Sequence, residues 1–308
     1  MPGAKQTFAE DIDKQGDIIG VYYDNDGTHG FIRRADGVFQ FFSGPDNALP
    51  GGMSANGLIT GGIPQDRAFI GTLEGAVMPF YVREIHSPSG LDINSTGEVA
   101  GFGTGLTQAD RAFFRNANGR VRKFDAPGAG TASGLGTRAL AIAEDGTICG
   151  TVTTRRGRIH GFLRDKHGNV TVFDPPRAKA TVAIAIARDG TVMGSYLDSG
   201  VVWHAYMRAP DGSFASFDAP GAGTEYEQGT MLKGVNRKGF ITGSVIDSSY
   251  VSHGYVRNPN AEFELFDAPG AGQGSSEGTV PWRVNDHNEV VGVYYDEHLQ
   301  AHSFIRLP

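Results

Sequence analysis

A glycine inside a repeated Gly-x-[Tyr/Val/Ile/Thr]-x-[Asp/Thr] phrase recurs along this chain. Successive copies lie 41, 40, 49, 44, 49 and 49 residues apart, at Gly20, Gly61, Gly101, Gly150, Gly194, Gly243 and Gly292. A period of 40 to 50 residues is typical of a ring or stack of repeated units, each of which buries its faces only against its neighbours. The repeat therefore predicts one domain over residues 1–308, although the length alone would suggest about two.

Residues 181–223 show what one unit contains. Four short runs rich in β-branched and aromatic residues are separated by turns such as Asp189-Gly190 and Asp211-Gly212, which is the pattern of strands joined by hairpins. No segment has a helical period of apolar residues. Four strands per unit predict an all-β, seven-bladed β-propeller. We expect the blades at about 9–50, 51–88, 89–135, 136–178, 179–228, 229–277, and 278–308 together with 1–8.

The ends of the sequence suggest how the ring closes. A Gly precedes a Phe by five residues at the last turn of most units, for example Gly212 and Phe217, and the same spacing recurs at Gly3 and Phe8. The last unit has no such segment of its own. We therefore expect residues 1–8 to supply the fourth strand of the last blade, which would remove both exposed sheet edges.

Composition excludes several classes of protein. The net charge of −7 with no basic run argues against a nucleic-acid or anionic-membrane surface, and no apolar run is long enough to cross a membrane. The single cysteine, Cys149, lies in an expected strand, where it would act as a small buried hydrophobe. No disulfide is possible, no Rossmann, P-loop or nucleophile-elbow motif is present, and the sequence leaves any cofactor unknown. Residues 1–5 carry no signal-peptide pattern.

Several phrases resemble the bacterial HAF repeat family, which is named for a His-Ala-Phe-like triplet. The phrases are YYDNDGTHGFIRR, SHGYVRN and FDAPGAG, and the triplet reads His29-Gly30-Phe31, His160-Gly161-Phe162, His204-Ala205-Tyr206, His253-Gly254-Tyr255 and His302-Ser303-Phe304. The second and third units have Arg67-Ala68-Phe69 and Arg111-Ala112-Phe113 instead. The resemblance covers essentially the whole chain and implies an extracellular or periplasmic β-propeller, but it carries no common activity.

Loop length predicts which face binds a ligand. The connections between the first and second and between the third and fourth strands of each unit are tight turns, and they share one face of the ring, the turn face. The other connections, including the FDAPGAG segments, are long and varied, and they share the opposite face, the loop face. Because binding residues concentrate on long loops held by a rigid scaffold, we expect the site on the loop face.

The repeated histidines could bind a metal ion, form catalytic dyads with aspartates, or have a structural role. The third strand of each unit lies two strand spacings of about 4.8 Å outside the innermost strand. Histidines on the third strands of different units are therefore too far apart to bind one metal ion, which needs ligands at about 2 Å. We therefore expect no metal site, and expect each histidine to hold its loop through an aspartate. The expected pairs are Asp24–His29, Asp198–His204, Asp247–His253 and Asp296–His302.

Function should then lie where the units differ. As catalytic candidates we select a base, His86 or Glu227, and a cation that stabilises an anionic transition state, Arg138 or Arg283. As ligand-binding candidates we select Arg67, Arg111, Tyr23, Tyr226, Trp282, Tyr295 and Lys233. Arg67 and Arg111 are either a fork for a carboxylate or phosphate or substitutes for the structural histidine. Trp282 could equally pack between blades, and Lys233 and Arg283 could be salt-bridged supports.

Two functions fit these residues. The first is a ligand-binding propeller that recognises carbohydrate or a small anionic molecule near the central channel of the loop face, with Tyr and Trp stacking on sugar rings. The second is a hydrolase or lyase with a single site on the same face. In either case we expect a monomer with a small-molecule or glycan partner, and neither nucleic-acid binding nor membrane insertion.

Overall fold

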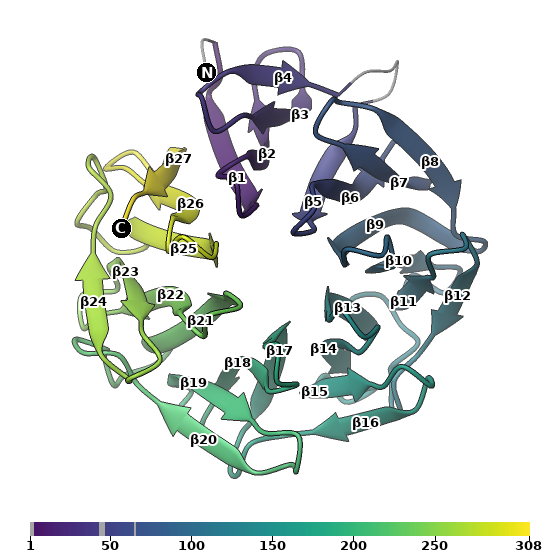
Figure 1. Ribbon diagram of the computed structural model, residues 1–308. Coiled ribbons are helices and arrows are strands. Elements are labelled where there is room, and N and C mark those ends of the chain that lie inside the picture. The colour runs from purple at the N-terminus through teal and green to yellow at the C-terminus, as the bar shows by residue number, and fades with distance from the viewer. Residues whose placement is uncertain (1–2, 43–46, 65) are drawn as a thin grey trace.

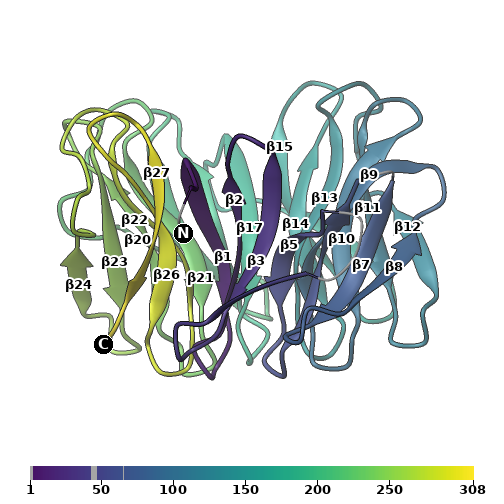
Figure 2. The ribbon, with the colours of Figure 1, turned by 90° about the horizontal axis from the view of Figure 1, so that it is seen from above.

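In the computed structural model, which describes residues 3–42, 47–64 and 66–308, these residues form strands and no helices. They contain no helix that could span a membrane. Groups of antiparallel strands stand around a central opening (Figure 1), and the view turned by 90° shows the strands running between two faces (Figure 2). Single parallel residue pairs join some neighbouring groups, so the described strands form sheets of 4, 8, 11 and 4 strands. This radial arrangement of strand groups is propeller-like.

The strands group into seven units of consecutive, antiparallel strands. The first strands, innermost in Figure 1, are β1 (Gln6–Ile12), β5 (Leu49–Met53), β9 (Ile85–Ile93), β13 (Gly136–Ile142), β17 (Ala180–Ile186), β21 (Gly229–Val235) and β25 (Gly278–Val284). The second strands are β2 (Ile18–Tyr23), β6 (Leu58–Ile63), β10 (Val99–Gly105), β14 (Ile148–Thr153), β18 (Val192–Leu197), β22 (Ile241–Ile246) and β26 (Val290–Tyr295).

The third strands are β3 (Thr28–Arg33), β7 (Arg67–Thr72), β11 (Asp110–Arg115), β15 (Ile159–Arg164), β19 (Trp203–Arg208), β23 (Ser252–Arg257) and β27 (Ala301–Arg306). The outer strands on the rim are β4 (Phe39–Phe41), β8 (Val77–Tyr81), β12 (Val121–Phe124), β16 (Val170–Phe173), β20 (Phe214–Phe217) and β24 (Phe263–Phe266). Within the described residues, the last unit has three strands. The four-strand pattern expected from the sequence is therefore found in the other six.

The repeated glycine is required by a close approach of two backbones. In each first strand a β-bulge brings a carbonyl against the glycine of the second strand. A Cβ built on Gly194 would lie 1.9 Å from the Val182 carbonyl oxygen, and one on Gly150 would lie 2.0 Å from that of Arg138. On the other side the glycine lies directly opposite the aromatic residue of the HAF-like triplet, as Gly150 lies opposite Phe162. The two repeated motifs are thus one packing unit.

Aromatic side chains join neighbouring units. The last Phe of an outer strand packs on the triplet aromatic of the next unit, with ring centroids 5.9 Å apart for Phe124 and Phe162 and again for Phe266 and Phe304. The arginine that ends the next third strand stacks over the same ring, as Arg306 does over Phe266 at 5.0 Å. These cation–π contacts extend each hydrophobic core to the rim.

The first and last units meet differently from the expectation. Phe8 lies opposite Val21 in β2, so residues 6–8 belong to the first strand of the first unit, not to an outer strand of the last. The reason is the register: Ala9 precedes Gly20 by eleven residues, as Ala139 precedes Gly150. In place of a shared strand, the Ser303 N–H donates to Thr7 Oγ1 at 2.8 Å across this junction.

Candidate functional site

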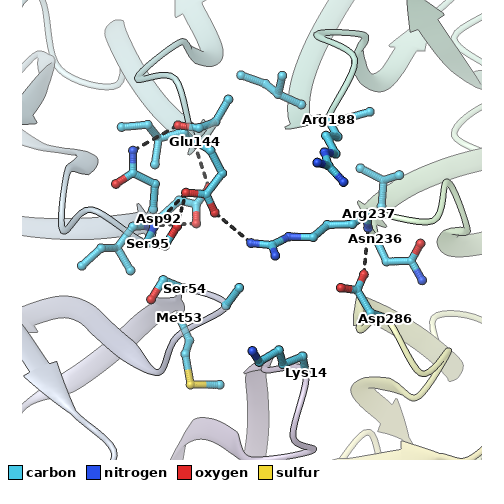
Figure 3. Close-up of a pocket in the computed structure, with 18 of the residues that line it drawn as sticks. Lys14, Met53, Ser54, Asp92, Ser95, Glu144, Arg188, Asn236, Arg237 and Asp286 are labelled. Carbon is cyan, nitrogen blue, oxygen red and sulfur yellow. Dashed lines mark hydrogen bonds and ion pairs between the residues drawn. The ribbon is translucent and has the colours of Figure 1, made fainter.

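A cavity of about 840 Å³ opens at the turn face, around the axis of the molecule (Figure 3). It is lined by the turns between first and second strands of all seven units, at residues 12–14, 53–55, 92–95, 142–145, 147, 186–190, 235–237 and 284–286. The cavity therefore lies on the face opposite the one that loop length favoured. The turns are short, as expected, but they converge on the axis, so their side chains enclose a shared space that no single turn could form.

One side chain per turn occupies an equivalent place in this lining, six residues before the repeated glycine. The seven residues, here called the turn ring, are Lys14, Ala55, Ser95, Glu144, Arg188, Arg237 and Asp286. Arg237 reaches across to Glu144, with Nη2 2.9 Å from Oε1 (Figure 3). Lys14 and Arg188 are exposed, and neither makes a hydrogen bond or ion pair with any residue the structure describes.

Acidic residues of the lining, in contrast, already accept hydrogen bonds from neighbouring groups of the protein. The Ser95 hydroxyl donates to the Glu144 carboxylate, and the Arg237 N–H donates to Asp286 Oδ1 at 3.0 Å. Asp189 Oδ1 accepts the N–H of Thr191 at 2.9 Å within its own turn. The cavity mouth thus combines carboxylates that already accept hydrogen bonds with two cations, Lys14 and Arg188, that have no carboxylate partner among the described residues.

A second charged group lies on the first strands, above the turn ring. Asp11, Asp92 and Arg283 hold one repeat position, nine residues before the repeated glycine. Asp11 accepts the N–H of Met53 from the next unit at 2.9 Å and lies 3.8 Å from Arg283 Nε. Asp92 accepts the N–H of Ile142 from the next unit at 2.8 Å. The two carboxylates therefore also connect adjacent units.

Burial shifts the pKa values in this group. It raises the pKa of Asp92 to about 7 and that of Glu10 to about 7, in both cases against a lowering effect of the Arg283 charge. It also raises the pKa of Asp11. The pKa of Lys233 is lowered, first by burial and then by repulsion from Arg283. Groups that titrate near neutrality beside a fixed cation are suited to proton transfer.

The structure brings together three of the residues selected from the sequence. Arg283 Nη1 donates to the carbonyls of Trp282 at 3.2 Å and Lys233 at 3.3 Å. They lie in the second halves of β21 and β25, toward the turn face, and not toward the loop face where we expected the site. Glu10, Asp11 and Asp92 were missed. Aligning the units on the repeated glycine would have placed Asp11 and Asp92 beside Arg283 in register.

The other catalytic candidates lie apart from this group. His86 Nδ1 contacts Asp66 Oδ2 at 2.8 Å, and the pKa of Asp66 is lowered by the Ser87 N–H and by His86. Arg138 Nε donates to Asp110 Oδ2 at 2.5 Å, and its guanidinium lies 5.1 Å from the Phe102 ring. Glu227 adopts a φ of 59° and donates its N–H to the Val201 carbonyl. No described contact joins His86, Glu227, Arg138 and Arg283 to one another.

The remaining ligand-binding candidates are spread over several units. Tyr23 is 41% and Tyr226 59% exposed, while Tyr295 is half-buried at the end of β26. Arg111 gives two guanidinium donors to Asp125, at 2.7 and 3.3 Å. Arg67 occupies the corresponding position at the start of β7. The Arg111 contact matches its interpretation as a substitute for the repeated histidine.

The repeated histidines do contact the expected aspartates. The distances are 3.1 Å for His29–Asp24, 2.9 Å for His302–Asp296, 3.7 Å for His204–Asp198 and 3.5 Å for His253–Asp247. A second aspartate, directly after the outer strand, was missed: His160, His204 and His253 direct Nδ1 to Asp174, Asp218 and Asp267 at 2.6, 2.9 and 3.0 Å. Its signal was the Phe-Asp pair that ends four of the expected outer strands, including Phe173-Asp174. No group of three potential ligands among the described residues is arranged to hold a metal ion.

No protein-family model matches this chain, and no curated protein matches it in sequence. Among solved structures, streptogramin B lyase is similar, with a TM-score of 0.65 and 12% identity over 99% of this chain and 95% of its own. Puromycin hydrolase has a TM-score of 0.62 and 14% identity over 98% of this chain and 53% of its own. A prolyl endopeptidase structure has a TM-score of 0.59 and 12% identity, covering 97% and 46%. At these identities the likeness shows the fold alone: an all-β, propeller-like protein.

Proposed function

We propose that this protein is a ligand-binding propeller that takes a small anionic molecule into the turn-face cavity. The observation that carries the proposal is the pair of unpaired cations, Lys14 and Arg188, in the lining of that cavity. Exposed cations with no carboxylate partner can bind a carboxylate or phosphate without first breaking an internal ion pair. The volume of about 840 Å³ lies within the range of small-molecule sites.

The scaffold we propose is a seven-bladed propeller with a closed ring. Packing of β1 against β26 and β27 supports closure by side chains, as do the Ser303–Thr7 hydrogen bond and the one from Asn285 Nδ2 to the Asp13 carbonyl at 2.9 Å. Membership of the HAF repeat family and a monomeric state also remain proposals. The loop face, where loop length led us to expect the site, remains the alternative binding surface.

Binding can be tested by calorimetry with a panel of carboxylates, phosphates and neutral sugars of similar size. We expect an anionic member to bind, and Lys14→Gln and Arg188→Gln each to weaken it by about tenfold, the value of one charge-assisted hydrogen bond. Lys238→Gln is the matched control, because Lys238 is exposed on a neighbouring turn position outside the lining. If the neutral sugars bind, and both variants bind them as tightly as the parent does, the binding site does not depend on Lys14 and Arg188 and the proposal is wrong.

A hydrolase or lyase is the second candidate, and the observation that favours it is the Glu10, Asp92 and Arg283 group. A carboxyl group with a pKa of about 7 can take a proton from a substrate at neutral pH. Arg283 can then stabilise the negative charge that develops on the substrate. Mass spectrometry of lactones and esters after incubation would test this. If Glu10→Gln abolishes turnover and leaves the melting temperature unchanged, the result would support the enzyme function. If the protein converts none of the lactones and esters, the binding function is favoured.

A further inference from the structure

The last unit exposes a strand edge that the other units cover. In each of the first six units an outer strand pairs with the third strand, as β24 pairs with β23. Among the described residues nothing pairs with the outer side of β27 (Figure 1). A row of free backbone groups can accept a further strand.

The covered units show what such a strand must contain. Four outer strands end in Phe and are followed by Asp, at Phe124-Asp125, Phe173-Asp174, Phe217-Asp218 and Phe266-Asp267. The Phe lies opposite a small residue of the third strand, as Phe266 lies opposite Gly254. In the last unit Ser303 occupies the position of that small residue. The phenyl ring of an added outer strand would pack on Phe31, the triplet aromatic of the first unit.

The last unit also contains a histidine that could bind the aspartate that follows such a Phe. His160, His204 and His253 each hold it through Nδ1. The His302 ring bonds only Asp296, through Nε2 at 2.9 Å, and its Nδ1 has no partner in the described part of the chain. The His302 side chain is 40% exposed, against 18%, 22% and 25% for the three occupied histidines. His302 is therefore open on the side where an aspartate would bind.

The residue after the aspartate has a receptor too. The hydroxyls of Thr137, Thr230 and Thr279 each accept the N–H of the Ala that follows Phe-Asp, at 2.9 Å. Thr7 stands at the same repeat position, thirteen residues before the repeated glycine. Its hydroxyl instead accepts the Ser303 N–H at 2.8 Å. An incoming segment would take over that hydroxyl.

We propose that β27 binds an extended Phe-Asp-Ala-Pro segment of a partner polypeptide, which adds antiparallel to it as the missing outer strand. The backbone edge supplies affinity, as in other cases of strand addition. His302, Thr7 and the small-residue position at Ser303 supply specificity for Asp, Ala and Phe respectively. This interaction is independent of the turn-face cavity.

The test uses the full chain and a labelled peptide that copies residues 261–271, followed by fluorescence anisotropy. We expect saturable binding, weakened about tenfold when the Asp of the peptide becomes Asn and by a similar factor when its second Phe becomes Ala. Absence of saturable binding, or equal binding of a scrambled peptide, overturns the proposal.

His302→Phe keeps an aromatic ring to stack on Tyr294, at 5.0 Å in the parent, but removes both ring nitrogens. With this variant the peptide should no longer distinguish Asp from Asn. His29→Phe is the matched control, because His29 stacks on Tyr22 at 4.9 Å and contacts Asp24 in the first unit. Loss of the Asp preference in the control as well would overturn the assignment to β27, as would a dimer of the chain alone that His302→Phe dissociates.

A graft provides a second measurement. Residues 262–277 placed directly before Gln6, in place of residues 1–5, reproduce the spacing between an outer strand and the next first strand. We expect the melting temperature to rise by a few degrees, since the edge is then covered. The same graft with Asp267→Asn and Phe266→Ala should give a smaller rise; no difference between the two grafts contradicts the proposal.

Discussion

The guanidinium of Arg237 lies 2.9 Å from the Glu144 carboxylate, although the two residues are 93 positions apart and belong to units that are not neighbours. The contact bridges the mouth of the turn-face cavity (Figure 3). It ties down one of the three cations of the turn ring and leaves Lys14 and Arg188 free of described partners. The bridge therefore competes with an anionic ligand for Arg237.

Glu144→Gln should strengthen the binding of an anionic ligand. The substitution removes the charge that holds Arg237, so the guanidinium can turn to the ligand, and we expect the dissociation constant to fall by about three- to tenfold. Isothermal titration at low salt measures it. Asp145→Asn is the control, because Asp145 is the next residue in the same turn and accepts the Thr147 N–H, which Asn can also do. Equal effects of both variants would point to general charge and not to the bridge.

The unfolding free energy should fall as the pH rises from about 4 to 8. Glu10 and Asp92 have folded-state pKa values of about 7, above ordinary values of 4.5 and 3.8, so folding favours their protonated forms. This stabilisation is complete below the unfolded-state pKa values and is lost as the pH passes 7. Urea unfolding at pH 5 and pH 8 measures the difference.

Asp92→Asn should reduce this pH dependence, because the buried ionisable group is gone. Asp189→Asn, an exposed carboxylate of the same cavity lining, should leave it unchanged. An unchanged dependence in Asp92→Asn would show instead that Asp92 is ionised in both the folded and the unfolded state over this range.

Gly194→Ala should destabilise the fold by at least about 2 kcal/mol. The new Cβ would lie 1.9 Å from the Val182 carbonyl oxygen, so the first strand of the unit must move. Gly200→Ala, in a loop of the same unit, meets Asp198 Oδ1 only at 3.4 Å and should cost much less. Chemical denaturation compares the two, and similar costs would mean that the bulge relaxes.

His204 and Asp218 should be coupled in stability. Their contact of 2.9 Å is partly exposed, so a double-mutant cycle should give about 0.5–1 kcal/mol. His298→Ala is a suitable reference, since that side chain is 77% exposed and 3.9 Å from Glu297. If His204→Ala abolishes ligand binding while the melting temperature is unchanged, the repeated histidines are functional and the structural interpretation is wrong.

The fold was readable from the sequence because its signals are local. The spacing from Ala139 to Gly150 and the Gly150–Phe162 contact lie within one unit, so each unit repeats them in order. The same locality explains the error at the ends. The five-residue spacing of Gly3 and Phe8 resembled an outer strand, while the eleven-residue spacing of Ala9 and Gly20 assigns the segment to a first strand.

The sequence by itself determined the strand content, the repeat and the aspartate that precedes each of four repeated histidines, since these depend on residues within one hairpin. Only the tertiary structure placed Lys14, Glu144, Arg188 and Arg237 around one cavity and Asp11 beside Arg283. Residues from different units meet because the units are arranged about an axis, and that arrangement follows from packing between whole sheets. A pattern within one unit contains no information about which residues face each other across the opening.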